Sequence, residues 1–190
     1  FGTALREKRE AALAAVAAFG FLTVRSGNRL GVLITGGDQL QWLPFRSGRT
    51  GLMASLTAIY DTPRHERGPA PEAGLAAGLA RVARTQRRRG QVIAVSDFLD
   101  ASDWATPLRT LSLRHQVIAV QIVDPRELEL PDVGMLAVVD AETGQTLHVQ
   151  TGSPGLRERY RVAAERRQAD IRRRIIDAGA EHLRLATDRD

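Results

Sequence analysis

Two patterns of apolar residues run along the chain: short uninterrupted runs and stripes at helical spacing. The segments Leu30–Thr35, Val92–Val95 and Val117–Val123 are apolar runs of strand length, which is typical of strands covered on both faces. Residues His182–Leu185 form a shorter run of the same kind. We expect these four segments to be inner or near-inner strands of one mostly parallel sheet.

Helical patterns separate these runs. The first predicts a helix from Thr3 to about Gly20, and the others predict helices over residues 51–60, from Pro71 to the stop at residues 87–90, over 104–113 and over 154–178. Two hairpins complete the pattern: residues 36–38 form a turn into an edge strand at 39–45, and residues 135–150 form an extra β-hairpin with an exposed tip at 140–144. This order predicts a three-layer α/β domain, with helices on both faces of the sheet.

Length and composition narrow the class of protein. The chain has 190 residues, 43 % of them hydrophobic, and no cysteine, so we expect a single folded domain over 1–190 without disulfides or thiolate chemistry. Because the chain opens at Phe1 directly into a helix, we expect it to be part of a longer protein. No apolar run reaches the roughly 20 residues of a membrane span, and Ala11–Leu22 lacks a cleavage site, so we expect a cytoplasmic domain without membrane contact.

The net charge of +5 comes almost wholly from arginine, since Lys8 is the single lysine. Eight arginines lie between Arg157 and Arg174, interleaved with acidic residues, and a mixed-charge helix face is usually solvated. Aromatic residues make up 5 % of the chain, too few for a platform on which bases stack. We therefore expect no specific nucleic acid partner, and at most weak, salt-sensitive binding.

Candidate chemistry lies where the predicted strands end. Asp97 follows one inner strand and Asp124 the next, and ligands of parallel α/β sheets bind at the carboxyl ends of strands. Two such carboxylates could hold Mg²⁺ for a metal-assisted phosphohydrolase, or each could simply cap the turn that follows it. The four histidines are widely spaced and none has a second ligand at helical spacing, so we expect them on the surface or in loops.

Several segments resemble a known family. Residues 95–100 and 114–120 resemble the second half of a von Willebrand factor A-like domain. Residues 123–127, Leu130-Pro131, Gly134 and Asp140–Gly144, together with residues 1–3 and 28–33, resemble the bacterial domain-of-unknown-function family fifty-eight. Members of that family accompany MoxR-type AAA+ ATPases. The resemblance covers essentially the whole chain.

The resemblance implies a mostly parallel, Rossmann-like sheet and a metal-ion-dependent adhesion site, of which only Asp97 matches here. The Asp-x-Ser-x-Ser strand of that site would precede Phe1, and the threonine position of a later loop aligns with about Ala73. We therefore expect no cofactor, and Mg²⁺ only if such an upstream strand exists. In the family order the missing strand lies between residues 30–35 and 92–95, where we expect a gap, a strand supplied from elsewhere, or direct closure.

The resemblance also implies a non-enzymatic adaptor that works with a MoxR-type ATPase on client protein complexes. Partner-binding residues are expected where loops leave the sheet, because loops on a rigid scaffold carry binding residues. These residues are Asp97, Phe98, Asp100, Asp124, Arg126 and Glu127, with the 140–144 tip as a second contact. The alternatives are the phosphohydrolase that uses Asp97 and Asp124, and a weak electrostatic nucleic-acid binder.

Overall fold

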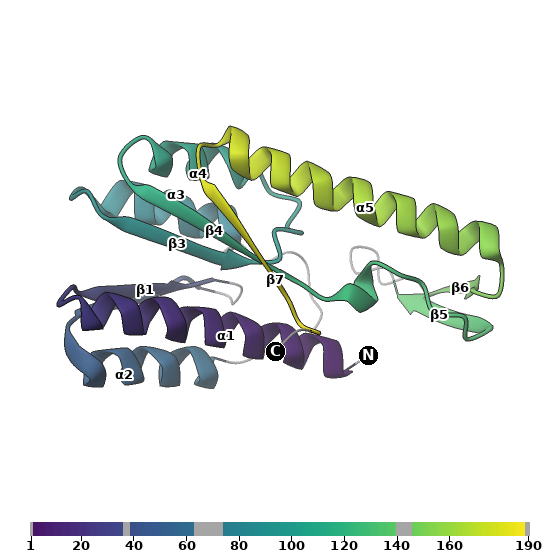
Figure 1. Ribbon diagram of the computed structural model, residues 1–190, viewed down its shortest axis with the longest axis horizontal. Helices are drawn as coiled ribbons and strands as arrows, with labels where there is room; N and C mark the ends of the chain where they lie inside the picture. Colours follow the sequence, from purple (N-terminus) through teal and green to yellow (C-terminus); the bar gives the residue numbers. More distant parts are fainter. Residues whose placement is uncertain (1, 36–38, 63–73, 140–145, 189–190) are drawn as a thin grey trace.

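A computed structural model describes residues 2–35, 39–62, 74–139 and 146–188. Helices lie on both sides of a central sheet in this part of the chain, as the apolar runs predict (Figure 1). The helices are α1 (Gly2–Arg25), α2 (Gly48–Asp61), α3 (Leu75–Thr85), α4 (Ala105–Ser112), the short η1 (Pro125–Glu127) and α5 (Pro154–Asp177). The strands are β1 (Leu30–Ile34), β2 (Gln41–Arg46), β3 (Gln91–Ser96), β4 (Gln116–Val123), β5 (Met135–Val139), β6 (Thr146–Gln150) and β7 (Glu181–Ala186).

The central sheet has three parallel strands in the order β3-β4-β7. Val92 of β3 pairs with Val117 of β4, and Val120 of β4 pairs with Leu183 of β7. The expectation that four segments are inner or near-inner strands of one sheet is wrong for three of them: residues 30–35 lie in a separate sheet, and β3 and β7 are the edge strands of the described central sheet. Leu183 of β7 is 41 % exposed.

The first two strands form a separate sheet. β1 and β2 pair antiparallel, with Leu33 opposite Trp42, and no described strand joins β1 to β3. Of the three outcomes expected between these segments, the described residues show the gap. Every residue of β1 is half-buried although its sequence, Leu-Gly-Val-Leu-Ile, is almost wholly apolar, because its second edge has no neighbouring strand among the described residues.

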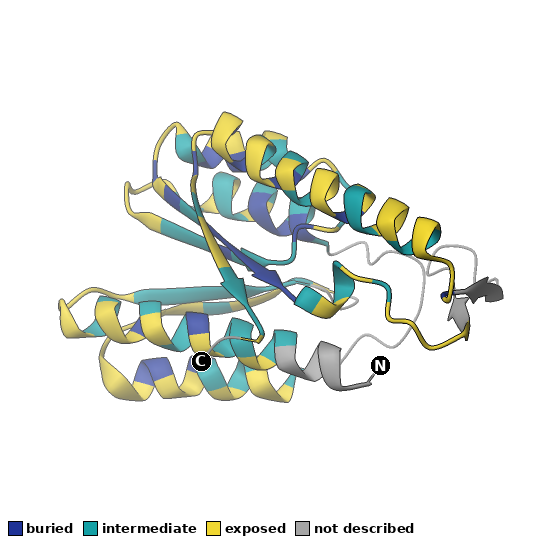
Figure 2. Ribbon diagram, turned by 45° about the vertical axis from the view of Figure 1, so that its right-hand side comes forward, coloured by how far each residue is buried: buried dark blue, intermediate teal, exposed yellow. Residues whose placement is uncertain are grey.

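Side chains of the central sheet are buried on both faces. Val117 and Ala119 of β4 pack with residues of α3, α4 and α5, such as Ile175. Val120 and Ile122, which alternate with them along the strand, pack with Ala15 of α1 on the other face. Figure 2 shows the buried residues concentrated in β4 and in the inward faces of the helices, while the outward face of α5 is exposed.

The first helix is longer than the sequence predicts and ends at Arg25 rather than Gly20. Gly20 does not stop the helix but lets α2 approach it, since a Cβ atom there would lie 2.4 Å from the Cδ1 atom of Leu52. Turn signals at residues 36–38 lie outside the described residues. The second hairpin, β5 and β6, forms as expected and lies near the N-terminal end of α5 (Figure 1).

Candidate functional site

The loops that leave the carboxyl ends of β3 and β4 form a rim at one edge of the central sheet. After β3 the chain turns sharply: the Asp97 Oδ1 atom accepts a hydrogen bond from the Leu99 amide at 3.1 Å, and the Ser96 hydroxyl accepts one from the Phe98 amide at 3.1 Å. Phe98 has φ +57°, which is unusual for a residue with a side chain. Its ring packs edge-on against Trp104 at 5.1 Å between centroids, and this packing holds the turn.

Lys8 of α1 connects the two loops of the rim. Its Nζ atom lies 3.3 Å from the Asp97 Oδ2 atom and 2.5 Å from the Glu127 Oε2 atom. The Lys8 side chain is only 11 % exposed, whereas those of Asp97 and Glu127 are 38 % and 41 % exposed. One ammonium group thus links two carboxylates that remain accessible, and one negative charge of the trio is left uncompensated.

Hydrogen bonds between two side chains and the backbone hold the loop after β4. The Asp124 Oδ1 atom accepts a hydrogen bond from the Arg126 amide at 2.9 Å and caps η1. The Tyr160 hydroxyl of α5 donates to the Glu127 carbonyl oxygen at 3.0 Å, which fixes the end of η1. These bonds hold the Glu127 backbone beside Lys8.

Asp100 has a similar supporting role in the first loop. Its carboxylate accepts hydrogen bonds from the Ser102 amide at 2.8 Å and from the Leu75 amide at the start of α3 at 3.1 Å. Partial burial acts to raise the pKa of Asp100, but the hydrogen bonds from Ser102 and Leu75 outweigh it, and the pKa lies below its ordinary value. The charged form of Asp100 therefore joins the rim to α3.

The six residues expected to bind a partner differ in their exposure to solvent. Asp97, Arg126 and Glu127 reach the surface of the rim, and Asp100 is half-buried. Phe98 and Asp124 are 2 % and 1 % exposed, so in this conformation their side chains are not available to a partner. Ala73 and the 140–144 tip lie outside the described residues.

The carboxylates that the sequence offers to a metal have other contacts. Asp97 binds Lys8 and the Leu99 amide, and Asp124 caps η1 as the simpler interpretation of a strand-end aspartate predicts. In the part of the chain that the structure describes, no three His, Asp or Glu side chains come together as a metal-binding group. Nor does any helix within the same part have the length and apolar character to cross a membrane.

Sequence reasoning did not identify Lys8 as a rim residue. It is 89 residues from Asp97 and 119 from Glu127, and no local pattern reports contacts of that range. One signal was available: Lys8 is the single lysine in a chain that otherwise uses arginine. The histidine prediction holds for His115, which is buried but lies in the loop before β4, and fails for His182, which is half-buried in β7.

Known proteins resemble this chain in sequence and in fold. Uncharacterized protein Rv1480 of Mycobacterium tuberculosis and uncharacterized protein Mb1516 of Mycobacterium bovis are each 42 % identical to it over 190 residues. The alignment covers 100 % of this chain but 59 % of those relatives. Uncharacterized protein MAV169 of Mycobacterium avium is 40 % identical over 148 residues, which are 78 % of this chain and 86 % of that protein.

Two solved structures share the fold at low sequence identity. An aerotolerance-related membrane protein from Bacteroides fragilis superposes with a TM-score of 0.53 at 13 % identity, over 94 % of this chain and 80 % of its own. The conserved hypothetical protein BatB from Bacteroides thetaiotaomicron gives 0.50 at 11 % identity, over 92 % and 80 %. The family described as "Protein of unknown function DUF58" matches residues 1–170. The chain therefore belongs to the DUF58 family, as the resemblance of its motifs predicts.

Proposed function

We propose that this domain is a non-enzymatic adaptor that binds a MoxR-type AAA+ ATPase and assists in the assembly or maturation of client protein complexes. The proposal rests on the family resemblance and on one structural observation: Asp97 and Glu127 present accessible carboxylates from two different loops, and Lys8 holds them together. The ATPase and the client complex are the partners, and the cytoplasm is the compartment in which they would meet.

The rim suits a partner surface that carries positive charge. Lys8 compensates one of the two carboxylates, and the other remains to attract a basic group. Charges at the edge of an interface set the rate of encounter and the orientation of the partners more than the affinity. Because Phe98 and Trp104 hold the first loop from below, the rim is a prepared surface that loses little conformational entropy on binding.

A capture experiment tests the partnership. The ATPase is captured with the wild-type protein, with Asp97→Arg, and with a variant whose 140–144 tip is replaced by a short turn. We expect Asp97→Arg to weaken capture strongly, because a guanidinium beside Lys8 reverses the charge of the rim. Asp61→Arg is the matched control, since Asp61 is an exposed carboxylate at the end of α2.

The possible outcomes distinguish an error in the proposed binding surface from an error in the proposed partnership. If both rim and tip variants stay folded and capture as much ATPase as wild type, the proposed surface is wrong. If the wild-type protein captures none, the partnership is wrong. Titration with Mg²⁺ while the melting temperature is followed tests the phosphohydrolase alternative, because a ligand that binds only the folded state raises that temperature. We expect no rise at micromolar metal, and a rise that Asp97→Ala abolishes would favour the alternative.

A further inference from the structure

Most of the net charge of the chain resides on one helix. Eight arginines against four carboxylates give α5 a charge of +4, while the whole chain carries +5. The rest of the molecule is thus nearly neutral. A helix that concentrates charge in this way creates a local positive potential that the overall composition does not reveal.

Ion pairs on α5 compensate some of these arginines but not others. Arg161 binds both Glu158 and Glu165, and two further arginines bind acids outside the helix, namely Arg157 with Asp132 and Arg174 with Asp103. Four exposed arginines of α5 have no ion-pair partner among the described residues. They are Arg159, Arg166, Arg167 and Arg172.

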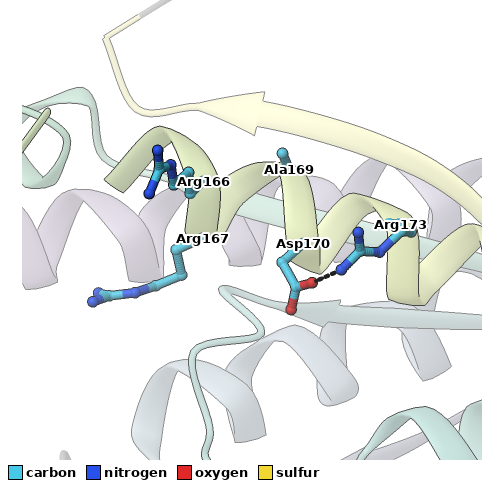
Figure 3. Close-up of a pocket in the computed structure, with 5 residues that line it drawn as sticks. All are labelled: Arg166, Arg167, Ala169, Asp170 and Arg173. Atoms are coloured by element: carbon cyan, nitrogen blue, oxygen red, sulfur yellow. Dashed lines mark hydrogen bonds and ion pairs between the residues drawn. The ribbon is translucent and has the colours of Figure 1, made fainter. Parts of the chain in front are cut away.

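Arg159 and Arg166 share the outward side of the helix with the ion-paired Arg173, and Arg167 and Arg172 flank that side. Arg159, Arg166 and Arg173 are seven residues apart, so they lie on one stripe with a spacing of about 10 Å. Ile171 and Ile175, on the opposite side, are buried against the sheet. Figure 3 shows Arg173 paired with Asp170, and Arg166 and Arg167 extending away from that pair. We call Arg159, Arg166, Arg167 and Arg173 the α5 basic face.

We propose that the α5 basic face adsorbs to the surface of an anionic lipid bilayer. The stripe from Arg159 to Arg173 is straight and about 21 Å long, which matches a planar array of negative headgroups. Ala163, Ala169 and the Arg173-paired Asp170 lie between its arginines, so the stripe lacks the large apolar or aromatic centre of a protein interface. Tyr160, beside the stripe, is the single aromatic residue of α5, too few for a platform on which bases stack.

This inference revises the expectation that the chain has no membrane contact. That expectation rested on the lack of an apolar span and on the mixed charges of residues 157–174. Adsorption needs neither a span nor an inserted apolar face, because clustered arginines near an anionic surface each contribute to binding. The structure separates the paired arginines from the unpaired ones, which the sequence pattern could not do.

Sedimentation with vesicles tests the proposal. The purified protein is mixed with vesicles of phosphatidylcholine alone, or of phosphatidylcholine with phosphatidylserine, at low and at physiological salt. We expect binding only to the phosphatidylserine vesicles, with an affinity that falls as salt rises. The variant R159Q/R166Q/R167Q removes three charges and breaks no ion pair of the described residues. Its binding is expected to fall roughly a hundredfold, about fivefold for each arginine.

The matched control is R87Q/R88Q/R89Q, which removes the same charge from the exposed segment after α3. We expect this control to bind within about twofold of wild type, because charges outside the contact surface act weakly. Equal loss in both variants would mean that net charge alone drives binding and would overturn the proposal. Failure of the wild type to bind phosphatidylserine vesicles would overturn it too, as would tighter binding of duplex DNA than of vesicles at physiological salt. Circular dichroism and melting temperature verify that each variant is folded.

Discussion

The ammonium nitrogen of Lys8 lies 2.5 Å from the Oε2 atom of Glu127, in a loop 119 residues further along the chain. This contact joins the start of α1 to the end of the β4 loop, and the same ammonium reaches Asp97 after β3. Three elements that are distant in sequence thus share one charge at the carboxyl edge of the sheet.

Lys8→Met should destabilise the fold by about 1–2 kcal/mol, because it removes two charge-assisted hydrogen bonds that are partly shielded from solvent. Chemical denaturation measures this loss. Lys8→Arg, which keeps the charge, should recover part of it. In the double variant with Glu127→Gln the two losses should not add, since both substitutions remove the same contact. Full additivity would show that the contact does not form in solution.

Phe98→Ala should lower the free energy of unfolding by more, about 3–4 kcal/mol, because the ring is 2 % exposed and packs on Trp104. The same denaturation measurement on Leu99→Ala provides the comparison, since Leu99 is the next residue and is 40 % exposed. We expect less than about 1 kcal/mol there. Equal losses at the two positions would mean that the turn after β3 does not bury Phe98.

His182 should make stability depend on pH. Burial lowers the pKa of His182 below its ordinary 6.5, and the positive charges of Arg172 and Arg184 lower it further. The folded protein therefore binds a proton at His182 less readily than the unfolded chain does. The stability that neutral His182 contributes is complete above pH 6.5 and is lost as the pH falls from there towards the lower folded-state pKa.

The measurement is the free energy of unfolding between pH 7.5 and 5, compared with that of His182→Gln. The variant keeps a group that can donate to the Gln121 Oε1 atom, 2.9 Å from the histidine nitrogen in the wild type. We expect the wild type to lose more stability than the variant over this range. Parallel curves for the two proteins would contradict the lowered pKa.

The strands should differ in the rate at which their backbone amides exchange hydrogen with solvent. β4 is paired on both sides, whereas β3 has one described partner and β1 pairs only with β2. Amides of β4 should therefore exchange most slowly, and about half of those in β1 and β3 should exchange fast, because alternate amides point to the free edge. Uniform protection across β1 and β3 would show that a further strand closes the gap.

The order of elements could be predicted from the sequence because the strands β1, β3 and β4 are apolar runs separated by helical patterns. β3 is one residue longer than the predicted segment at each end, and β4 begins one residue earlier than predicted and ends at Val123 as predicted. We misjudged β7, because His182-Leu183-Arg184-Leu185 alternates polar and apolar residues and is not the continuous apolar run of an inner strand. We also misjudged Gly20, which ends no helix because α2 needs close approach there.

The site could be predicted only in part. Strand-end aspartates are visible in the sequence, and Asp97 and Asp124 do lie at the rim. The two carboxylates differ in exposure: Asp124 is buried, whereas Asp97 is half-exposed beside Lys8. The acidic residues Asp97 and Asp100 near Phe98 in the sequence suggest an exposed loop. Packing on Trp104 nevertheless buries the Phe98 side chain.

Binding of the purified MoxR-type ATPase to this domain and to Glu127→Arg tests the proposed adaptor role most directly. Glu127 is 41 % exposed, so its replacement changes the rim surface itself. We expect the dissociation constant to rise roughly tenfold or more for Glu127→Arg and by less than about twofold for the control Asp61→Arg. Equal affinities of the wild type and Glu127→Arg, with both folded, would contradict the proposed rim, and no binding by the wild type would contradict the adaptor role.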